Sequence, residues 1–358
     1  MAPPFSLYGR LQPANRYGRL SAMFYDVICI GAGPTGLATA IEARRAGLRP
    51  LVIDRGCLCN SLYRYPVQMV FFTTAERMEI GGLPLVTAGT KPTRAEALKY
   101  YRRAAEHYEL EVRLGEELLA VEGGDERFLV HTRTGRGERY SYRGRKLVLA
   151  TGYYDQPNPL GVPGEELPHV SHYYTEAHPC WRREVVVIGG RNSAAETALD
   201  LFRGGARVTL LHRGPTLGPT VKYWLRPDLE NRIRAGEIQA LFNARVVRIE
   251  PEHVFVEVGG QQQRVRAEQV FAMTGYHPNF ELLRSLGIAL EPESLRPRCD
   301  PDTLETNVPG VFLAGVLVGG LHTAEIFIEN GRFHGEKIVA ALTGRVLQAA
   351  EPTRPPGE

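Results

Sequence analysis

The feature that most constrains the fold is a glycine-rich turn between an apolar segment, residues 24–30, and a segment with apolar residues at helical spacing, residues 37–46. The turn reads Gly31-Ala32-Gly33-Pro34-Thr35-Gly36. In such a strand–turn–helix unit, the glycines allow a tight turn, approach of the backbone to a pyrophosphate, and close packing of helix on strand. The next apolar strand ends at Asp54, whose carboxylate can accept hydrogen bonds from a ribose. This order predicts a Rossmann-like dinucleotide-binding domain.

The same order recurs where the apolar segment 184–188 leads into Gly189-Gly190-Arg191-Asn192-Ser193-Ala194 and a second helical pattern. Arg191 replaces the middle glycine of the pattern, and Ala194 replaces the third. The strand that follows ends in His212-Arg213 instead of an acid. Positive charge at that place matches the 2′-phosphate of NADPH, whereas an acid would match the ribose of NADH. The second unit is therefore predicted to bind NADPH; the alternative is that these side chains form only a solvated basic rim.

The remaining segments indicate how the two units are connected. Two buried-type strands close on Thr151-Gly152 and Thr274-Gly275, each downstream of a glycine-rich turn. Prolines near residue 157 mark a first crossing between domains, and residues 276–279 mark a second. A last strand ends in small residues at Gly315 and is expected to return to the first domain. We therefore expect an α/β fold with two Rossmann-like, three-layer ββα domains, consisting of residues 23–157 with 280–358, and of residues 158–279, after a disordered tail at residues 1–22.

The composition gives little support to other classes of function. The net charge of +3 is small and the charged residues are interspersed, so neither nucleic-acid nor membrane-surface binding is expected. No segment has the about 20 consecutive apolar residues that cross a bilayer, and no signal peptide is apparent, so a cytoplasmic protein is expected. The five cysteines are irregularly spaced, which favours a reducing compartment. No metal-ligand spacing occurs, and no metal is expected.

Over nearly the whole chain after residue 23, the order of these segments resembles that of the flavoprotein oxidoreductases of the thioredoxin-reductase type. The closer resemblance is to the bacillithiol disulfide reductases. It is carried by Tyr65-Pro66, Phe71-Phe72, Lys91-Pro92, residues 150–154, 176–179 and 275–278, and the long stretch 326–335. The resemblance implies a homo-oligomeric NADPH-dependent flavoprotein that reduces the disulfide of a low-molecular-weight thiol. It implies FAD in the first domain and NADPH in the second.

The matching positions imply a set of binding residues for each cofactor. The FAD set is Gly31, Gly33, Pro34, Thr35, Gly36, Asp54, Thr151, Gly152, Gly315 and Val316. The NADPH set is Gly189, Gly190, Arg191, Asn192, Ser193, Ala194, His212, Arg213 and Gly275. Most thioredoxin-reductase relatives carry an aspartate where this chain has Val316, and the valine agrees with the bacillithiol-type subgroup.

The chain lacks the thiols that usually pass electrons to a disulfide. The place of the thioredoxin-reductase dithiol is taken by residues 171–174, which contain no cysteine. Many bacillithiol-type relatives have a cysteine within the first glycine-rich turn, where this chain has Thr35. Cys57 and Cys59 are too close in sequence for an unstrained disulfide, so we interpret them as ordinary thiols in a turn. Thr35, His172 and Tyr174 are candidates for groups that face the flavin, with ordinary packing as the alternative, and no catalytic residue is assigned.

Three functions stay open for the final electron transfer. The first is reduction of a low-molecular-weight disulfide. The second is another flavoenzyme activity, either a reductase for ferredoxin or a quinone, or a flavin monooxygenase. The third is a non-catalytic FAD and NADPH sensor, which the missing thiols motivate. The sequence predicts the cofactors and leaves the acceptor open.

Overall fold

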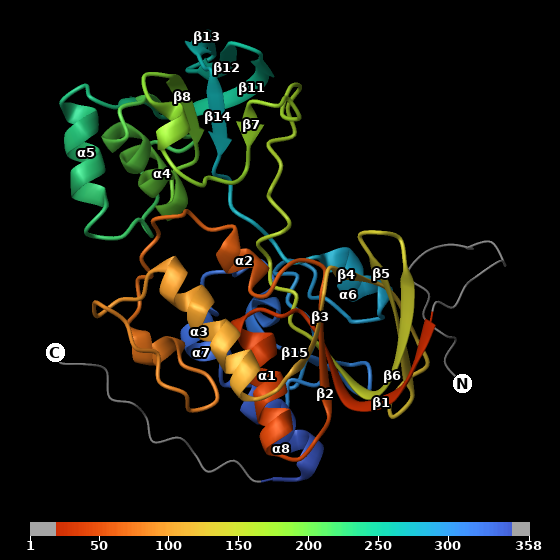
Figure 1. The fold of residues 1–358 in the computed structure, drawn as a ribbon. Coiled ribbons are helices and arrows are strands. Elements are labelled where there is room, and N and C mark those ends of the chain that lie inside the picture. Colours follow the sequence, from red (N-terminus) through yellow and green to blue (C-terminus); the bar gives the residue numbers. More distant parts are fainter. Residues whose placement is uncertain (1–18, 346–358) are drawn as a thin grey trace. The chain divides into compact units, whose positions relative to one another are not determined.

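The chain folds into two compact units, which Figure 1 shows in a computed structural model that describes residues 19–345. Unit 1 comprises residues 19–63, 70–155 and 277–345, and unit 2 comprises residues 64–69 and 156–276. The short segment 64–69 joins unit 2, because the N–H of Val67 donates to the carbonyl of Thr175 at 2.9 Å. The sequence predicted only two crossings between the domains and did not predict this segment.

The expected disordered tail ends earlier than residue 22. Residues 19–22 belong to the long first strand, because the backbone at Arg19 and Leu20 pairs with Tyr140 and Ser141 of another strand. This corrects the expectation for those four residues. Residues 1–18 of the expected tail lie outside the described part of the chain.

The described part of unit 1 contains a seven-stranded sheet in the order β3-β2-β1-β6-β5-β4, with β15 beside β6. Its strands are β1 (Arg19–Ile30), β2 (Pro50–Asp54), β3 (Glu111–Leu114), β4 (Glu116–Glu122), β5 (Phe128–Thr134), β6 (Arg139–Leu149) and β15 (Val311–Leu313). Strands β3, β2, β1, β6 and β15 run parallel, whereas β4, β5 and β6 form an antiparallel meander. The helices are α1 (Pro34–Arg45), α2 (Asn60–Tyr63), α3 (Arg94–His107), α6 (Phe280–Ser285), α7 (Ile328–Gly331) and α8 (His334–Thr343).

Two hydrophobic cores hold the layers of unit 1 together. Val27 and Cys29 of β1 pack in the core that contains residues of α1 and α8, and the alternating Ile28 and Ile30 pack in the core that contains residues of the meander. Both faces of the parallel strands are buried, so these four residues are apolar without alternation. The predicted three-layer α/β architecture is confirmed.

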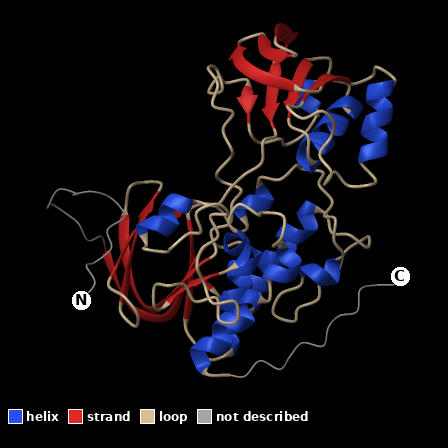
Figure 2. Cartoon of the chain, turned by 180° about the vertical axis from the view of Figure 1, so that it is seen from behind, coloured by secondary structure: helices blue, strands red, loops and turns tan. Residues whose placement is uncertain are grey.

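Unit 2 repeats this plan on a smaller scale (Figure 2). Its parallel sheet has the order β10-β9-β8-β14-β7, and a separate antiparallel sheet contains β11, β12 and β13. The strands are β7 (Val170–Ser171), β8 (Glu184–Ile188), β9 (Arg207–Leu211), β10 (Gln239–Leu241), β11 (Ala244–Glu250), β12 (His253–Val258), β13 (Gln261–Arg266) and β14 (Gln269–Ala272). The helices are α4 (Asn192–Arg203) and α5 (Arg226–Arg234). Val185 and Val187 pack with α4, while Val186 and Ile188 pack with β12.

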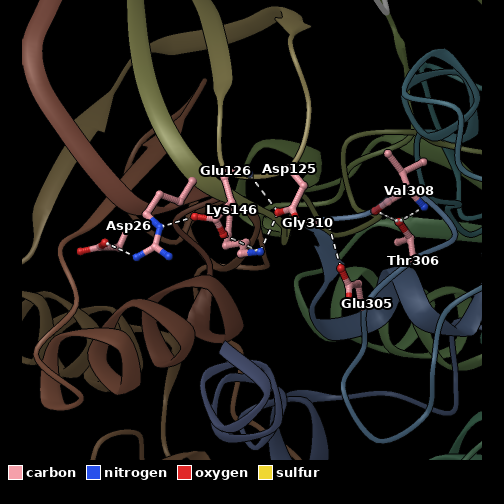
Figure 3. A network of polar contacts seen from close by, with 9 residues as sticks. Asp26, Asp125, Glu126, Lys146, Glu305, Thr306, Val308 and Gly310 are labelled. Carbon is pink, nitrogen blue, oxygen red and sulfur yellow. Dashed lines mark hydrogen bonds and ion pairs between the residues drawn. The ribbon is translucent and has the colours of Figure 1, made fainter. Parts of the chain in front are cut away.

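A polar network in unit 1 fixes the strand that returns from the far end of the chain (Figure 3). Lys146 Nζ binds the carboxylates of Asp125 at 2.6 Å and Glu126 at 2.9 Å. The N–H of Gly310 donates to Glu305 Oε1 at 2.7 Å, and a Cβ on Gly310 would lie 2.3 Å from Asp125 Oδ1. The turn before β15 therefore fits closely against the β5–β6 side of the sheet, which places Gly315 at the sheet end where the first glycine-rich turn lies.

Two further classes of feature are absent from residues 19–345. No helix there is long and apolar enough to cross a membrane. No group of three or more His, Cys, Asp or Glu side chains in the same part of the chain is arranged to hold a metal ion.

Candidate cofactor sites

The first glycine-rich turn lies between β1 and α1, and its glycines differ in what surrounds them. Gly31 has a φ of +116°, and a Cβ there would lie 2.3 Å from the carbonyl oxygen of Ala150. A Cβ on Gly36 would lie 2.0 Å from the carbonyl oxygen of Gly31. These two glycines are required by the protein's own packing.

Gly33 is different, because no protein atom lies within 4 Å of where its Cβ would be. It precedes α1, and no side chain caps that helix or places an acid in its first turn. The first N–H groups of the helix are therefore available to an anion, and the missing Cβ leaves room for it to approach. This arrangement fits the pyrophosphate of a dinucleotide.

Asp54, at the end of β2, holds this turn from the other side. Its Oδ2 accepts the N–H of Ala32 and its Oδ1 accepts the N–H of Gly56, both at 2.7 Å. Burial raises the pKa of the Asp54 carboxyl, and the two N–H groups oppose that effect. Each carboxylate oxygen keeps acceptor capacity for a further hydrogen bond, for example from a ribose hydroxyl.

A cavity of about 550 Å³ begins at Arg55, the residue after Asp54. Its walls come from the ends of β2 and β3, from β4, and from the β5–β6 hairpin. The lining residues are Arg55, Gly115, Glu117, Arg133, Thr134, Gly135 and Gly137. Sequence reasoning missed this group, because these residues lie in several separate segments and match no local motif.

The far end of the chain completes this region of unit 1. A Cβ on Gly315 would lie 3.1 Å from Thr35 Oγ1, and a Cβ on Gly331 would lie 3.3 Å from the same atom. Thr151 lies beside Gly31, because a Cβ on Gly31 would be 3.1 Å from the Thr151 nitrogen. Residues of the predicted FAD set from three distant segments thus meet at one end of the sheet. Val316 follows Gly315 and is half-buried in a 3₁₀ turn.

His334, at the start of α8, is a residue of this region that the sequence did not single out. Its Nδ1 accepts the N–H of Gly315 at 3.0 Å. Burial, and then the positive charge of Lys337, lower the pKa of His334 to about 4. The ring is therefore neutral at ordinary pH.

This histidine is expected to make the fold sensitive to acid. The unfolded chain binds a proton at His334 near pH 6.5 and the folded chain only near pH 4, so stability falls as the pH drops through this window. A difference of this size corresponds to about 3 kcal/mol at the acid end. Urea unfolding at several pH values would measure it in the wild type and in His334→Asn, which has no titrating ring. Parallel pH profiles for the two proteins would contradict the prediction.

The second glycine-rich turn lies between β8 and α4 in unit 2. Gly189 has a φ of +150°, and a Cβ there would lie 2.6 Å from the carbonyl oxygen of Met273 and 2.9 Å from the Cβ of Ala194. A Cβ on Gly190 would lie 2.4 Å from the ring of His212. The end of β9 thus lies directly over the turn, and the two parts of the predicted NADPH set are neighbours.

The charges in this part of unit 2 suit an anion. Burial, and then the positive charges of Arg213 and Arg191, lower the pKa of His212. Both arginines are exposed, and neither has a carboxylate partner among the described residues. Two unpaired guanidinium groups and an imidazole beside a dinucleotide-type turn fit a 2′-phosphate.

Asn192 is engaged with the protein itself. Its amide nitrogen donates to the carbonyl of Thr220 at 3.1 Å, and its Oδ1 accepts the N–H of Lys222 at 2.9 Å. The loop before α5 is thereby held against the start of α4, where Ser193 is exposed. Gly275, after β14, has a φ of +86° and lies near the side chain of Asn158.

The three flavin-facing candidates separate in the structure. Thr35 lies among the glycines of unit 1. Tyr174 is 4% exposed in the core of unit 2, where its hydroxyl donates to Asp200, so a flavin-facing role for its ring is not supported. His172 Nε2 pairs with Glu165 at 3.0 Å, also in unit 2. The Tyr174 ring packs in the hydrophobic core of unit 2, which is the alternative of ordinary packing that the sequence had left open.

None of the five cysteines has the properties of an activated thiol. All five are free, and desolvation raises the pKa of each of them. Nucleophilic cysteines usually have a lowered pKa, because the thiolate is the reactive form. Cys57 is exposed and Cys59 is buried, and they form no disulfide with each other.

A family model described as pyridine nucleotide-disulphide oxidoreductase matches residues 28–315, a segment that contains both glycine-rich turns. The chain belongs to this family. It is 42% identical over 320 residues to the bacilliredoxin reductase of Bacillus subtilis, covering 89% of this chain and 97% of that relative. The solved bacillithiol disulfide reductase of Bacillus cereus is also 42% identical, with a TM-score of 0.88 over 90% of this chain and all of that one. The predicted family is confirmed.

The comparisons also confirm the fold and the classes of cofactor. The thioredoxin reductase of T. acidophilum is 20% identical with a TM-score of 0.70 over 89% of this chain, which shows that the fold is thioredoxin-reductase-like. The chain is a flavoprotein oxidoreductase with FAD and NAD(P)H as cofactors, as its family membership establishes.

Proposed function

We propose that this protein is an NADPH-dependent reductase of the bacillithiol disulfide type, with FAD bound in unit 1 and NADPH in unit 2. The overall reaction is NADPH + H⁺ + RSSR → NADP⁺ + 2 RSH, in which two electrons reach the disulfide through FAD. The observation that carries the proposal is the contrast between the strands that follow the two turns: β2 ends at the acid Asp54, whereas β9 is followed by His212 and Arg213. The names of the two 42% identical relatives support a disulfide of bacillithiol or bacilliredoxin as the acceptor.

In unit 1, Gly33 and the start of α1 receive the FAD pyrophosphate, and Asp54 binds a ribose hydroxyl. The cavity at Arg55 takes the adenine end of the cofactor. Pro34, Thr35, Gly36, Thr151, Gly152, Gly315 and Val316 line the rest of the site. FAD supplies the hydride chemistry, and these residues bind it, orient it and exclude water.

In unit 2, the start of α4 receives the pyrophosphate of NADPH, and Arg191, His212 and Arg213 bind its 2′-phosphate. The positive charges of the two arginines, which have no acid partner within residues 19–345, support this assignment, and the neutral His212 ring adds a hydrogen-bonding group beside them. Asn192 positions the loop above the turn, and Gly275 lies at the end of β14 in the same layer.

No protein thiol relays electrons in this proposal. The position at which many relatives carry a cysteine is Thr35, and the thiols of the chain all have a raised pKa. The acceptor disulfide therefore takes its two electrons without forming a mixed disulfide with the enzyme. The free cysteines also support work in a reducing compartment such as the cytoplasm, and the resemblance to the bacillithiol disulfide reductases supports a homo-oligomer.

Alkylation of the exposed thiol tests this step. Iodoacetamide treatment, and separately Cys57→Ser, are expected to change disulfide-dependent NADPH oxidation by no more than about twofold, because no step needs the thiol. Mass spectrometry would establish which cysteines are modified. Loss of most of the activity in Cys57→Ser, with FAD still bound, would show that a thiol relay operates.

The proposed function as a whole is tested by anaerobic reduction with NADPH followed by mixing with single acceptors. Rapid reoxidation of the flavin by bacillithiol disulfide, and slow reoxidation by ferredoxin, quinone and oxygen, is the expected result. A purified protein that holds no FAD would overturn the proposal. Rapid reoxidation by ferredoxin or quinone alone would replace it with another reductase activity, and an oxygenated product would indicate a monooxygenase.

A further inference from the structure

Residues 326–335 form the longest stretch that resembles the bacillithiol disulfide reductases. None of them is among the residues proposed above to bind FAD or NADPH. The stretch contains α7 and the first two residues of α8. Gly331 faces Thr35 of the first glycine-rich turn. Gly335 lies directly on α1, because a Cβ there would be 2.6 Å from the Cα of Thr39. The start of α8 is therefore part of the wall of the proposed FAD site.

The hydrogen bond between Gly315 and His334 decides which ring nitrogen carries the proton. The backbone N–H of Gly315 can only donate, so Nδ1 of His334 is the acceptor and carries no hydrogen. The lowered pKa keeps the ring neutral, so its single N–H is on Nε2. His334 is thus a fixed hydrogen-bond donor at Nε2, with an orientation set by Gly315.

This Nε2–H has no partner among the described residues. It forms no hydrogen bond or ion pair with residues 19–345. The buried side-chain atoms without a partner are those of other residues, so the Nε2 atom of His334 is accessible from outside the protein. The half-buried ring therefore presents a donor to accessible space. A donor that is held in place, neutral and without a protein partner, next to Gly315 and Thr35, is suited to a ligand in that space.

We propose that His334 belongs to the FAD site, where Nδ1 holds the Gly315 turn and Nε2–H donates a hydrogen bond to the bound flavin. The inference rests on the proposed FAD site in unit 1. Reduction of the flavin adds negative charge, and a fixed donor binds the more negative form more tightly. His334 therefore favours the reduced flavin relative to the oxidised one and raises its reduction potential.

Two substitutions separate the roles of the two nitrogens. In His334→Asn the side-chain oxygen can still accept the N–H of Gly315, but no donor reaches the position of Nε2. We expect this protein to retain FAD and to bind the reduced form roughly tenfold less tightly relative to the oxidised form, which lowers the potential by about 30 mV. In His334→Ala both contacts are lost, and we expect FAD to dissociate on dilution as well. His334→Gln, whose amide can reach the position of Nε2, should return the potential toward the wild-type value.

The measurements are the potential of the bound flavin against a reference dye, its visible spectrum, and the fraction of FAD retained on dilution. The matched control is His107→Asn, an exposed histidine of α3, for which wild-type values are expected. A wild-type potential and spectrum in FAD-loaded His334→Asn or His334→Ala would overturn this inference and leave the proposed function intact. A wild-type protein without FAD would instead overturn the proposed function itself. If His334→Asn does not fold, the potential of His334→Ala measured in excess FAD decides: a fall larger than that of the control supports a flavin contact, and no change overturns it.

Discussion

Replacing Gly33 by alanine is expected to weaken FAD binding strongly while the protein itself stays folded. The new Cβ meets no protein atom within 4 Å, and the φ of −75° at Gly33 suits any residue. The methyl group would fill space that the FAD pyrophosphate needs, at a cost of about 1–3 kcal/mol, or roughly 10- to 100-fold in affinity. FAD content after purification and the melting temperature of the FAD-free protein are the two measurements.

Gly36→Ala is the matched variant for this experiment. Its Cβ would lie 2.0 Å from the carbonyl oxygen of Gly31, so the turn and α1 have to move apart. We expect destabilisation of at least about 3 kcal/mol together with loss of FAD. A stable Gly33→Ala protein and a destabilised Gly36→Ala protein would together show that Gly33 serves FAD binding and that Gly36 serves the stability of the fold. Normal FAD affinity in Gly33→Ala would place the pyrophosphate elsewhere.

Arg213→Ala is expected to remove most of the preference for NADPH over NADH. The guanidinium of Arg213 is exposed and has no acid partner among the described residues, so it is available to the 2′-phosphate. Loss of hydrogen bonds between charged groups of this kind costs about 1.5–3 kcal/mol, or roughly 10- to 100-fold in the KM for NADPH. NADH has no 2′-phosphate, so its KM should stay nearly unchanged. Steady-state kinetics with both donors would measure the effect.

Arg264→Ala provides the control for charge alone, since Arg264 is an exposed arginine of β13 in the same unit. We expect its KM values for both donors to match the wild type. An equal rise in both KM values in Arg213→Ala would show that Arg213 serves the common part of the dinucleotide. The 2′-phosphate would then have to bind elsewhere.

Much of the fold was predictable because its signals are local. The apolar residues 27–30, the glycines that follow and Asp54 all lie within one β-α-β segment, and each has a steric or hydrogen-bonding reason for its place. The structure places these residues together, with Asp54 bound to Ala32. The same reasoning identified the second turn. Because Arg213 stands where the first unit has the acid Asp54, it also indicated that the two turns bind different dinucleotides.

Other expectations needed information from distant residues. Arg19 and Leu20 looked like part of a disordered tail, yet they pair with β6, which lies about 120 residues later. Tyr174 looked available to a flavin, but its ring is buried and packs against Phe271 of β14, about 100 residues later. Neither contact leaves a signal in the local sequence, because the pairing partner is not adjacent.

The sequence by itself determined that there are two dinucleotide-binding units and that no cysteine occupies the usual redox positions. It also determined that the strand after the first turn ends in an acid, whereas the strand after the second turn is followed by a positively charged residue. Only the tertiary structure decided which distant residues lie beside the first glycine-rich turn. His334 meets Gly315, Gly331 meets Thr35, and the cavity at Arg55 takes its walls from the ends of several strands. The reason is physical: a turn is encoded by the steric needs of neighbouring residues, whereas a binding site is assembled by packing between segments that are far apart in the chain.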